Sequence, residues 1–171
     1  MTALGAATAS STDEISAGLE KFAAVSNSVG LSYEYATSAL ATVTATTRQS
    51  ADVVGTAFKT LFARIQDLEL GKTLDDGTTL GKYSQALETV GISIKTADGG
   101  LREMDDILSD LGEKWNSFDA EGNPLISDDA KVALAQTVAG VRQYTQLIAL
   151  MDNWDFMKEN LETARNATGT L

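Results

Sequence analysis

Residues 50–68 read SADVVGTAFKTLFARIQDL, and the spacing of apolar residues in this stretch decides the fold class. Six apolar side chains follow one another at intervals of three and four residues, which places them on one side of an α-helix. They are Ala51, Val54, Phe58, Leu61, Ile65 and Leu68. Val53, Ala57 and Phe62 make the apolar stripe wider than the seam of a two-stranded coiled coil. We therefore expect a helix, capped by Ser50, that packs into a multi-helix core.

The composition narrows the class of protein. The chain has 171 residues, of which 43% are hydrophobic and 22% are charged, values typical of a soluble globular protein with one domain or two small ones. A single proline favours helices. The sequence has no cysteine, which excludes disulfides and thiolate chemistry. It also has no histidine, so imidazole metal ligands and the usual general base near neutral pH are excluded.

The formal net charge of −11 argues against a nucleic-acid-binding surface, because phosphate contacts need clustered lysine and arginine side chains. The thirteen basic residues are scattered along the chain. No stretch reaches the roughly 20 apolar residues that span a bilayer, and the first residues lack the pattern of a signal peptide. We expect a soluble, acidic protein without nucleic-acid binding.

The whole chain is expected to form an all-α bundle of about six or seven helices, with one small β-hairpin near residues 92–102. Residues 1–11 are expected to be a flexible leader, 12–165 the helical module, and 166–171 a frayed tail or linker. Apolar periods and stop signals place the helices at about residues 13–29, 33–47, 51–68, 82–90, 104–118, 128–151 and 154–164. Ser32 is expected to cap the second helix, Asp105 the fifth, and Ser127 or Asp128 the sixth.

One loop resembles a calcium site in part. Asp119, Glu121 and Asn123 have the first three spacings of an EF-hand loop. The sixth position, which should be glycine, is Pro124, and the twelfth, which should be glutamate, is Ala130. The sequence therefore predicts a turn at residues 119–126 and no calcium site.

Other polar clusters also fail as sites. Residues 71–73 and 98–100 contain glycines but lack the flanking strand and the glycine spacing of a phosphate-binding loop. Three carboxylates, Asp105, Asp106 and Asp110, lie near one helix start, where the helix dipole and solvation account for them. We expect no catalytic, cofactor-binding or metal-binding residues and no enzymatic activity.

Three blocks of sequence resemble the core region of phage tail tape-measure proteins. They are TRQSADVVGTAFKTLFARIQDL at residues 47–68, VGISI…GGLREMDDIL…LGEKW at 90–115, and GVRQYTQLIALMDNW at 140–154. The blocks occur in the order of that family and, together, span almost the whole chain from about residue 10. The positions that match the family pattern include Arg48, Gln49, Gly55, Lys59, Phe62, Arg64, Gly91, Gly100, Trp115, Gly140, Arg142 and Trp154. Physically these are helix-packing positions together with three arginines that can pair with the abundant acids.

The resemblance implies a structural role in tail assembly and tail-length determination, in the lumen of the tail tube, with departure ahead of the DNA at ejection. Other tape-measure copies, the tail tube protein and tail assembly chaperones are the partners that it implies, with the host cytoplasm as the place of assembly. Self-association is also expected. The alternative is a membrane-active segment that assists genome passage, supported by the small-residue run at residues 36–47. A cell-wall hydrolase module is a third interpretation, but it lacks a recognisable site.

Overall fold

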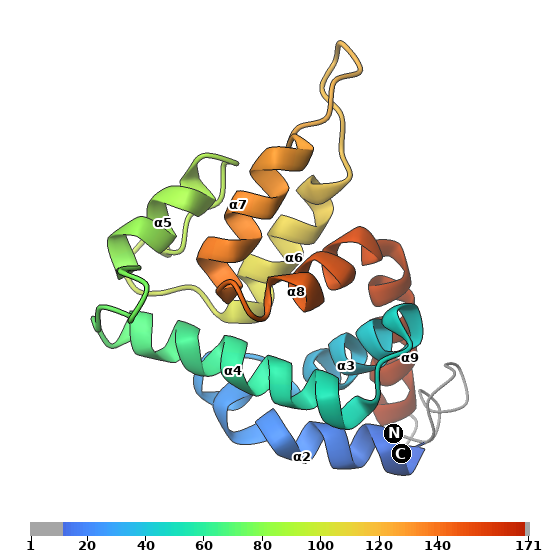
Figure 1. Ribbon diagram of the computed structural model, residues 1–171. Helices are drawn as coiled ribbons and strands as arrows, with labels where there is room; N and C mark the ends of the chain where they lie inside the picture. Colours follow the sequence, from blue (N-terminus) through green and yellow to red (C-terminus); the bar gives the residue numbers. More distant parts are fainter. Residues whose placement is uncertain (1–11, 170–171) are drawn as a thin grey trace.

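The computed structural model describes residues 12–169, and eight α-helices follow one another along that range (Figure 1). The helices are α2 (Thr12–Ser28), α3 (Tyr33–Thr47), α4 (Ala51–Glu69), α5 (Leu80–Glu88), α6 (Met104–Trp115), α7 (Asp128–Ala139), α8 (Tyr144–Asp152) and α9 (Trp154–Gly169). The all-α prediction is confirmed, with one helix more than the expected six or seven. The expected leader, 1–11, lies outside the described residues, and the expected boundary after residue 165 falls within α9.

Four of these helices have a serine or threonine as the N-cap residue. In each case the side-chain oxygen accepts a hydrogen bond from the backbone N–H three residues further on, which satisfies a donor that the helix itself leaves unpaired. The capping residues are Ser32, Ser50, Thr79 and Ser127. The predictions for Ser32, Ser50 and Ser127 are confirmed.

The prediction that Asp105 caps its helix is wrong, because α6 begins at Met104 and its N-cap residue, Glu103, makes no side-chain cap. The backbone N–H of Met104 donates instead to the carbonyl of Val29, and that of Asp105 to the carbonyl of Gly30. The connection between α2 and α3 thus supplies the acceptors for the first turn of α6, and no capping side chain is needed.

The predicted single helix over residues 128–151 is also wrong. Gly140 has φ +86° and ends α7, and α8 begins four residues later at Tyr144. A β-carbon at Gly140 would lie 3.4 Å from the guanidinium of Arg64, which packs against this break. The expected bend near residues 152–153 is confirmed, since α8 ends at Asp152 and α9 starts at Trp154.

The core of the protein is organised around α4, which lies along α2 (Figure 1). Phe58, Leu61, Phe62 and Ile65 are buried as predicted, and the two phenylalanines pack with Phe22 of α2. The prediction that Val53 belongs to the buried stripe is wrong, because this side chain is 49% exposed. The buried stripe is narrower than the sequence suggested at the start of α4.

Two glycines bring α2 and α4 into backbone contact. A β-carbon at Gly55 of α4 would lie 2.4 Å from the carbonyl oxygen of Gly18 in α2. A β-carbon at Gly18 would lie 2.6 Å from the carbonyl oxygen of Ala51. Only glycine leaves room for two helix backbones this close together.

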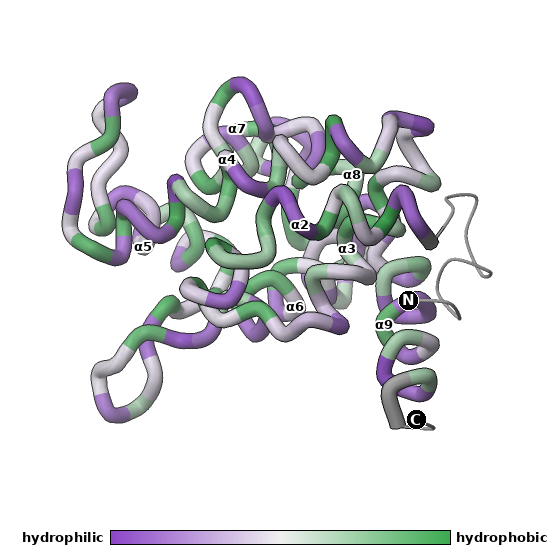
Figure 2. Tube along the Cα trace, turned by 90° about the horizontal axis from the view of Figure 1, so that it is seen from below, coloured by the Kyte–Doolittle hydropathy of each residue, from purple (hydrophilic) through white to green (hydrophobic). Residues whose placement is uncertain are grey.

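Helix α3 is central, and ten consecutive residues, 35–44, are buried in it. It packs against α2, α4, α8 and α9. The hydroxyl of Thr42 donates to the carbonyl of Ser38 and accepts a hydrogen bond of 2.9 Å from the side-chain amide of Asn160 in α9. Polar and apolar stretches alternate along α9, as expected for a helix with one face on the core (Figure 2).

The described residues, 12–169, form no β-sheet, but they contain two isolated antiparallel bridges. The expected hairpin near 92–102 is reduced to one bridge between Lys95 and Leu101. A second bridge joins Phe118 to Pro124 within residues 116–127, which we call the hairpin arm. Phe118, expected on the inner face of a helix, lies in this arm and is 65% exposed because α6 ends at Trp115.

Candidate functional site

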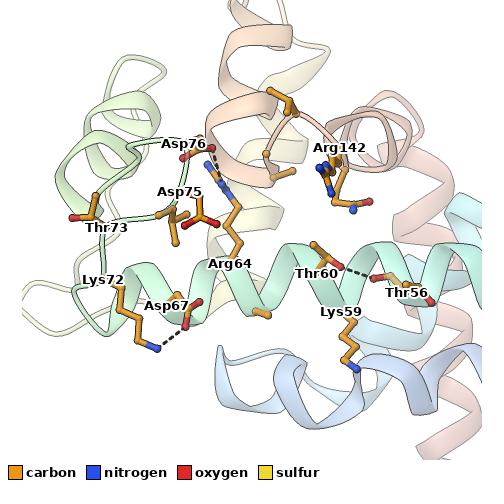
Figure 3. Close-up of a pocket in the computed structure, with 16 residues that line it drawn as sticks. Thr56, Lys59, Thr60, Arg64, Asp67, Lys72, Thr73, Asp75, Asp76 and Arg142 are labelled. Carbon is orange, nitrogen blue, oxygen red and sulfur yellow. Dashed lines mark hydrogen bonds and ion pairs between the residues drawn. The ribbon is translucent and has the colours of Figure 1, made fainter.

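A groove of about 950 Å³ lies between α4, the loop at residues 70–79 and the break at residues 139–143 (Figure 3). We call it the α4 groove. Helix α4 forms its floor, and the two connecting segments form its walls. Its polar lining includes Thr56, Lys59, Thr60, Arg64, Asp67, Lys72, Asp75, Asp76, Arg142 and Gln143.

Arg64 joins the three parts of the groove. Its guanidinium donates to the carboxylate of Asp76 at 2.9 Å, to the hydroxyl of Thr78 at 3.0 Å and to the carbonyl of Thr137 at 2.9 Å. The arginine side chain is only 13% exposed, so these bonds are partly shielded from water. Because Thr137 lies in the last turn of α7, the cation also faces the negative end of that helix dipole.

The loop wall of the groove has its own hydrogen bonds. The carboxylate of Asp76 accepts from the backbone N–H of Thr78, which lowers the pKa of Asp76, and the Arg64 cation lowers this pKa further. Lys72 pairs with Asp67 of α4 at 3.2 Å. The loop is therefore tied to α4 at two points.

Four of the motif positions singled out in the sequence meet at this groove: Lys59, Arg64, Gly140 and Arg142. Of the three arginines expected to pair with acids, Arg64 does so. Within the described residues, Arg48 and Arg142 form no ion pair, and both are exposed. Arg48 instead ends α3 with a left-handed backbone, φ +61°.

The other motif positions serve packing and turns away from the groove. Phe62 and Gly55 lie in the contact between α2 and α4. Trp115 and Trp154 are buried near the ends of α6 and α8, where their indole N–H groups donate to Asp152 and Glu113, respectively. The remaining three are Gln49, which accepts a hydrogen bond from Gln146, and the turn glycines Gly91 and Gly100.

The sequence matches the phage-related minor tail protein family over residues 1–128. The chain belongs to this family. A comparison with solved structures found no match. Membership assigns this tail protein a structural role in the virion tail. For a protein with a structural role, the helix packing and the surfaces described above are the features that matter for function.

The described residues of the tail protein show no group of three or more histidine, cysteine, aspartate or glutamate side chains arranged to hold a metal ion. None of the helices in the same residues has the length and apolar character needed to cross a membrane. The groove is instead a surface of paired charges, hydroxyl groups and three exposed charged side chains outside the ion pairs, Lys59, Arg142 and Asp75. Its Arg142 wall is suited to holding an acidic side chain of another protein segment.

Replacing Arg64 with methionine is expected to lower the free energy of unfolding by about 2 kcal/mol, because Asp76 loses its ion-pair partner and the carbonyl of Thr137 loses its donor. Urea denaturation followed by circular dichroism measures this effect. Lys59→Met is the matched control: Lys59 is exposed, and its variant should remain within about 0.5 kcal/mol of the wild type. Equal midpoints for the two variants would contradict the joining role of Arg64.

The carboxyl of Glu69 should make the stability of the protein depend on pH. Burial, with a smaller contribution from the charge of Glu103, raises the pKa of Glu69 to about 7 from a usual value of 4.5. The folded state therefore holds this proton more tightly, and the associated stability is complete below pH 4.5 and is lost as the pH rises through 7. Because Glu69 is only half-buried, we expect a loss of about 1 kcal/mol.

Glu69→Gln should remove this pH dependence and be more stable than the wild type by about 1 kcal/mol at pH 8, but not at pH 4. Thermal or urea unfolding at a series of pH values provides the measurement. Exposed Glu159→Gln on α9 is the control and should follow the wild type. If the difference in free energy of unfolding between the wild type and Glu69→Gln were constant from pH 4 to 8, the raised pKa of Glu69 would be disproved.

Proposed function

We propose that this chain is the core segment of a tail tape-measure protein, which helps to set the length of the tail and leaves it with the DNA. The observation that carries the proposal is the presence of three sequence blocks, in register with the tape-measure pattern, in a chain of the minor tail protein family. The helical fold agrees with this role, because the length of a helix is proportional to its number of residues, about 1.5 Å each.

The proposed role requires the segment to have two states of very different length. One continuous helix of 171 residues would be about 260 Å long, whereas a compact domain of this size has a radius of gyration of about 15–16 Å. The helices of the structure pack on one another, which corresponds to the compact state. Extension in a tail tube would require the tube wall or neighbouring copies to replace these helix–helix contacts.

Duplication of residues 12–165 in the phage tests the proposal. Electron microscopy of the assembled tails should show an increase of about 230 Å if the added segment is extended as a helix, or of about 40 Å if it stays compact. A point variant such as Lys95→Gln, which leaves the chain length unchanged, should give tails of wild-type length. Tails of unchanged length after the duplication would refute the role in length determination.

The proposed partners are further copies of the chain, the tail tube protein and the tail assembly chaperones, with the tube lumen as the proposed location. The net charge of −11 supports a surface that repels DNA passing through the same tube. The membrane-active alternative rested on the run of small residues at 36–47. These residues form most of α3, at the centre of the fold, so helix packing accounts for their small size. We therefore favour the assembly role.

A further inference from the structure

The hairpin arm, residues 116–127, projects from the body of the protein between the end of α6 and the start of α7 (Figure 1). Eight consecutive residues, 118–125, are exposed, although the arm is internally hydrogen-bonded. The backbone N–H of Asp119 donates to the carbonyl of Asn123, and that of Leu125 to the carbonyl of Ser117. The arm is thus a defined projection that contributes little of its own surface to the core.

The two edges of the arm differ. Phe118 and Pro124 form the non-hydrogen-bonded pair of the bridge, so their backbone polar groups point outward rather than toward each other. Pro124 has no N–H, which leaves only an acceptor on its edge. The Phe118 edge offers a donor, an acceptor and an aromatic ring that is 65% exposed. This edge is therefore the one suited to pairing with another chain.

The arm is complementary in charge, and similar in apolar character, to one wall of the α4 groove. The arm carries Asp119 and Glu121 and no basic residue. One wall of the groove carries exposed Arg142, which lies above the floor formed by α4 (Figure 3), and next to it Val141, which is 68% exposed; the opposite, loop wall carries the exposed carboxylate of Asp75. An acidic projection with an exposed aromatic ring thus has its complement at the wall formed by Val141 and Arg142, which is the wall away from Asp75.

An arm cannot fill the groove of its own chain. The arm precedes α7, and the groove is lined by the residues that follow α7. The 12 residues of α7 separate the two by about 18 Å, and the arm points away from the groove (Figure 1). A matching projection and hollow at opposite ends of one helix form a head-to-tail arrangement.

We propose that the hairpin arm of one copy of this chain docks into the α4 groove of the next copy. In this contact Phe118 packs against Val141, and the acidic tip with Glu121 approaches Arg142. The two surfaces are different, so the contact is heterologous and does not stop at a dimer unless the copies close into a ring. An arm with eight exposed residues buries a small area, so we expect a weak contact, with a Kd of about 10 µM to 1 mM.

Disulfide trapping tests this contact directly, because the chain has no cysteine of its own. The double variant Glu121→Cys/Arg142→Cys should form a ladder of dimers, trimers and larger species under mild oxidation. A mixture of the two single variants should stop at dimers. The control Glu121→Cys/Lys95→Cys places the second thiol at another exposed cation, away from the groove, and should cross-link at least about tenfold more slowly. Equal rates for the two double variants would overturn the proposal.

Charge reversal provides an independent test by sedimentation. Glu121→Lys or Arg142→Glu alone should raise the Kd at least about tenfold, and mixing the two variants should restore association, with the two variants in equal amounts in the assemblies. Glu159→Lys and Lys95→Glu are matched controls and should associate like the wild type. A wild type that stays monomeric up to about 1 mM, or variants that associate like it, would overturn the proposal. Both tests use the chain outside the virion, so their failure leaves the proposed role in tail length unaffected.

Discussion

Replacing Phe62 with alanine is expected to lower the free energy of unfolding by about 3–5 kcal/mol. The ring of Phe62 is 1% exposed and packs with Phe22, at 6.1 Å between centroids, and with Phe58, at 5.8 Å. Its removal leaves a cavity in the contact between α2 and α4 that the surrounding backbone cannot fill completely. Urea denaturation followed by circular dichroism should show the loss as a lower midpoint.

Phe118→Ala is the matched control for this prediction. It is the same substitution, but the ring of Phe118 lies in the hairpin arm and is 65% exposed, so the change should remain within about 0.5 kcal/mol of the wild type. If Phe62→Ala unfolded at the wild-type urea concentration, the packing of α2 on α4 described above would be incorrect.

Replacing Gly55 with alanine is expected to lower the free energy of unfolding by about 2–4 kcal/mol, even though alanine favours helix formation over glycine by about 1 kcal/mol. The added β-carbon would lie 2.4 Å from the carbonyl oxygen of Gly18. The obstructing atoms all belong to the backbone of α2, and no side-chain rotation relieves the contact. The two helices must therefore move apart, which loosens the packing of the phenylalanines next to them.

Gly81→Ala isolates the steric effect from the helix propensity. Gly81 lies in the first turn of α5, and a β-carbon there would have its nearest neighbour at 3.8 Å. This variant should be as stable as the wild type or more stable by up to about 1 kcal/mol. The prediction for Gly55 fails if both alanine variants change the melting temperature in the same direction.

The buried side of the helical core could be predicted from the sequence because it depends on local periodicity. Phe58, Leu61 and Ile65 lie at spacings of three and four on α4, and all are buried. The prediction for Val53 is wrong because the periodicity gives the direction of a side chain but not the extent of the neighbouring helix. At the start of α4, the covering surface ends before it reaches this residue.

The break at Gly140 could not be predicted, because a single glycine in an apolar period is compatible with a continuous helix. A residue distant in sequence, Arg64, stabilises the break. Its guanidinium occupies the space beside the glycine and donates to the carbonyl of Thr137. The α4 groove escaped prediction for the same reason. Its walls are loops about 60 residues apart in the sequence, and they have no shared pattern.

The position of α3 between the first and last described helices has a mechanical consequence. Helices α2 and α9 both pack on α3, and Asn160 ties α9 to Thr42. A tension applied at the two ends of the segment therefore acts first on these outer helices, and it pulls α9 from α3 and α2 from both α3 and α4. Part of the load on α9 passes directly to α6, because Glu113 of α6 binds Trp154 and Lys158 of α9. The segment should accordingly lengthen from its ends inward and keep α5 and α7 folded longest.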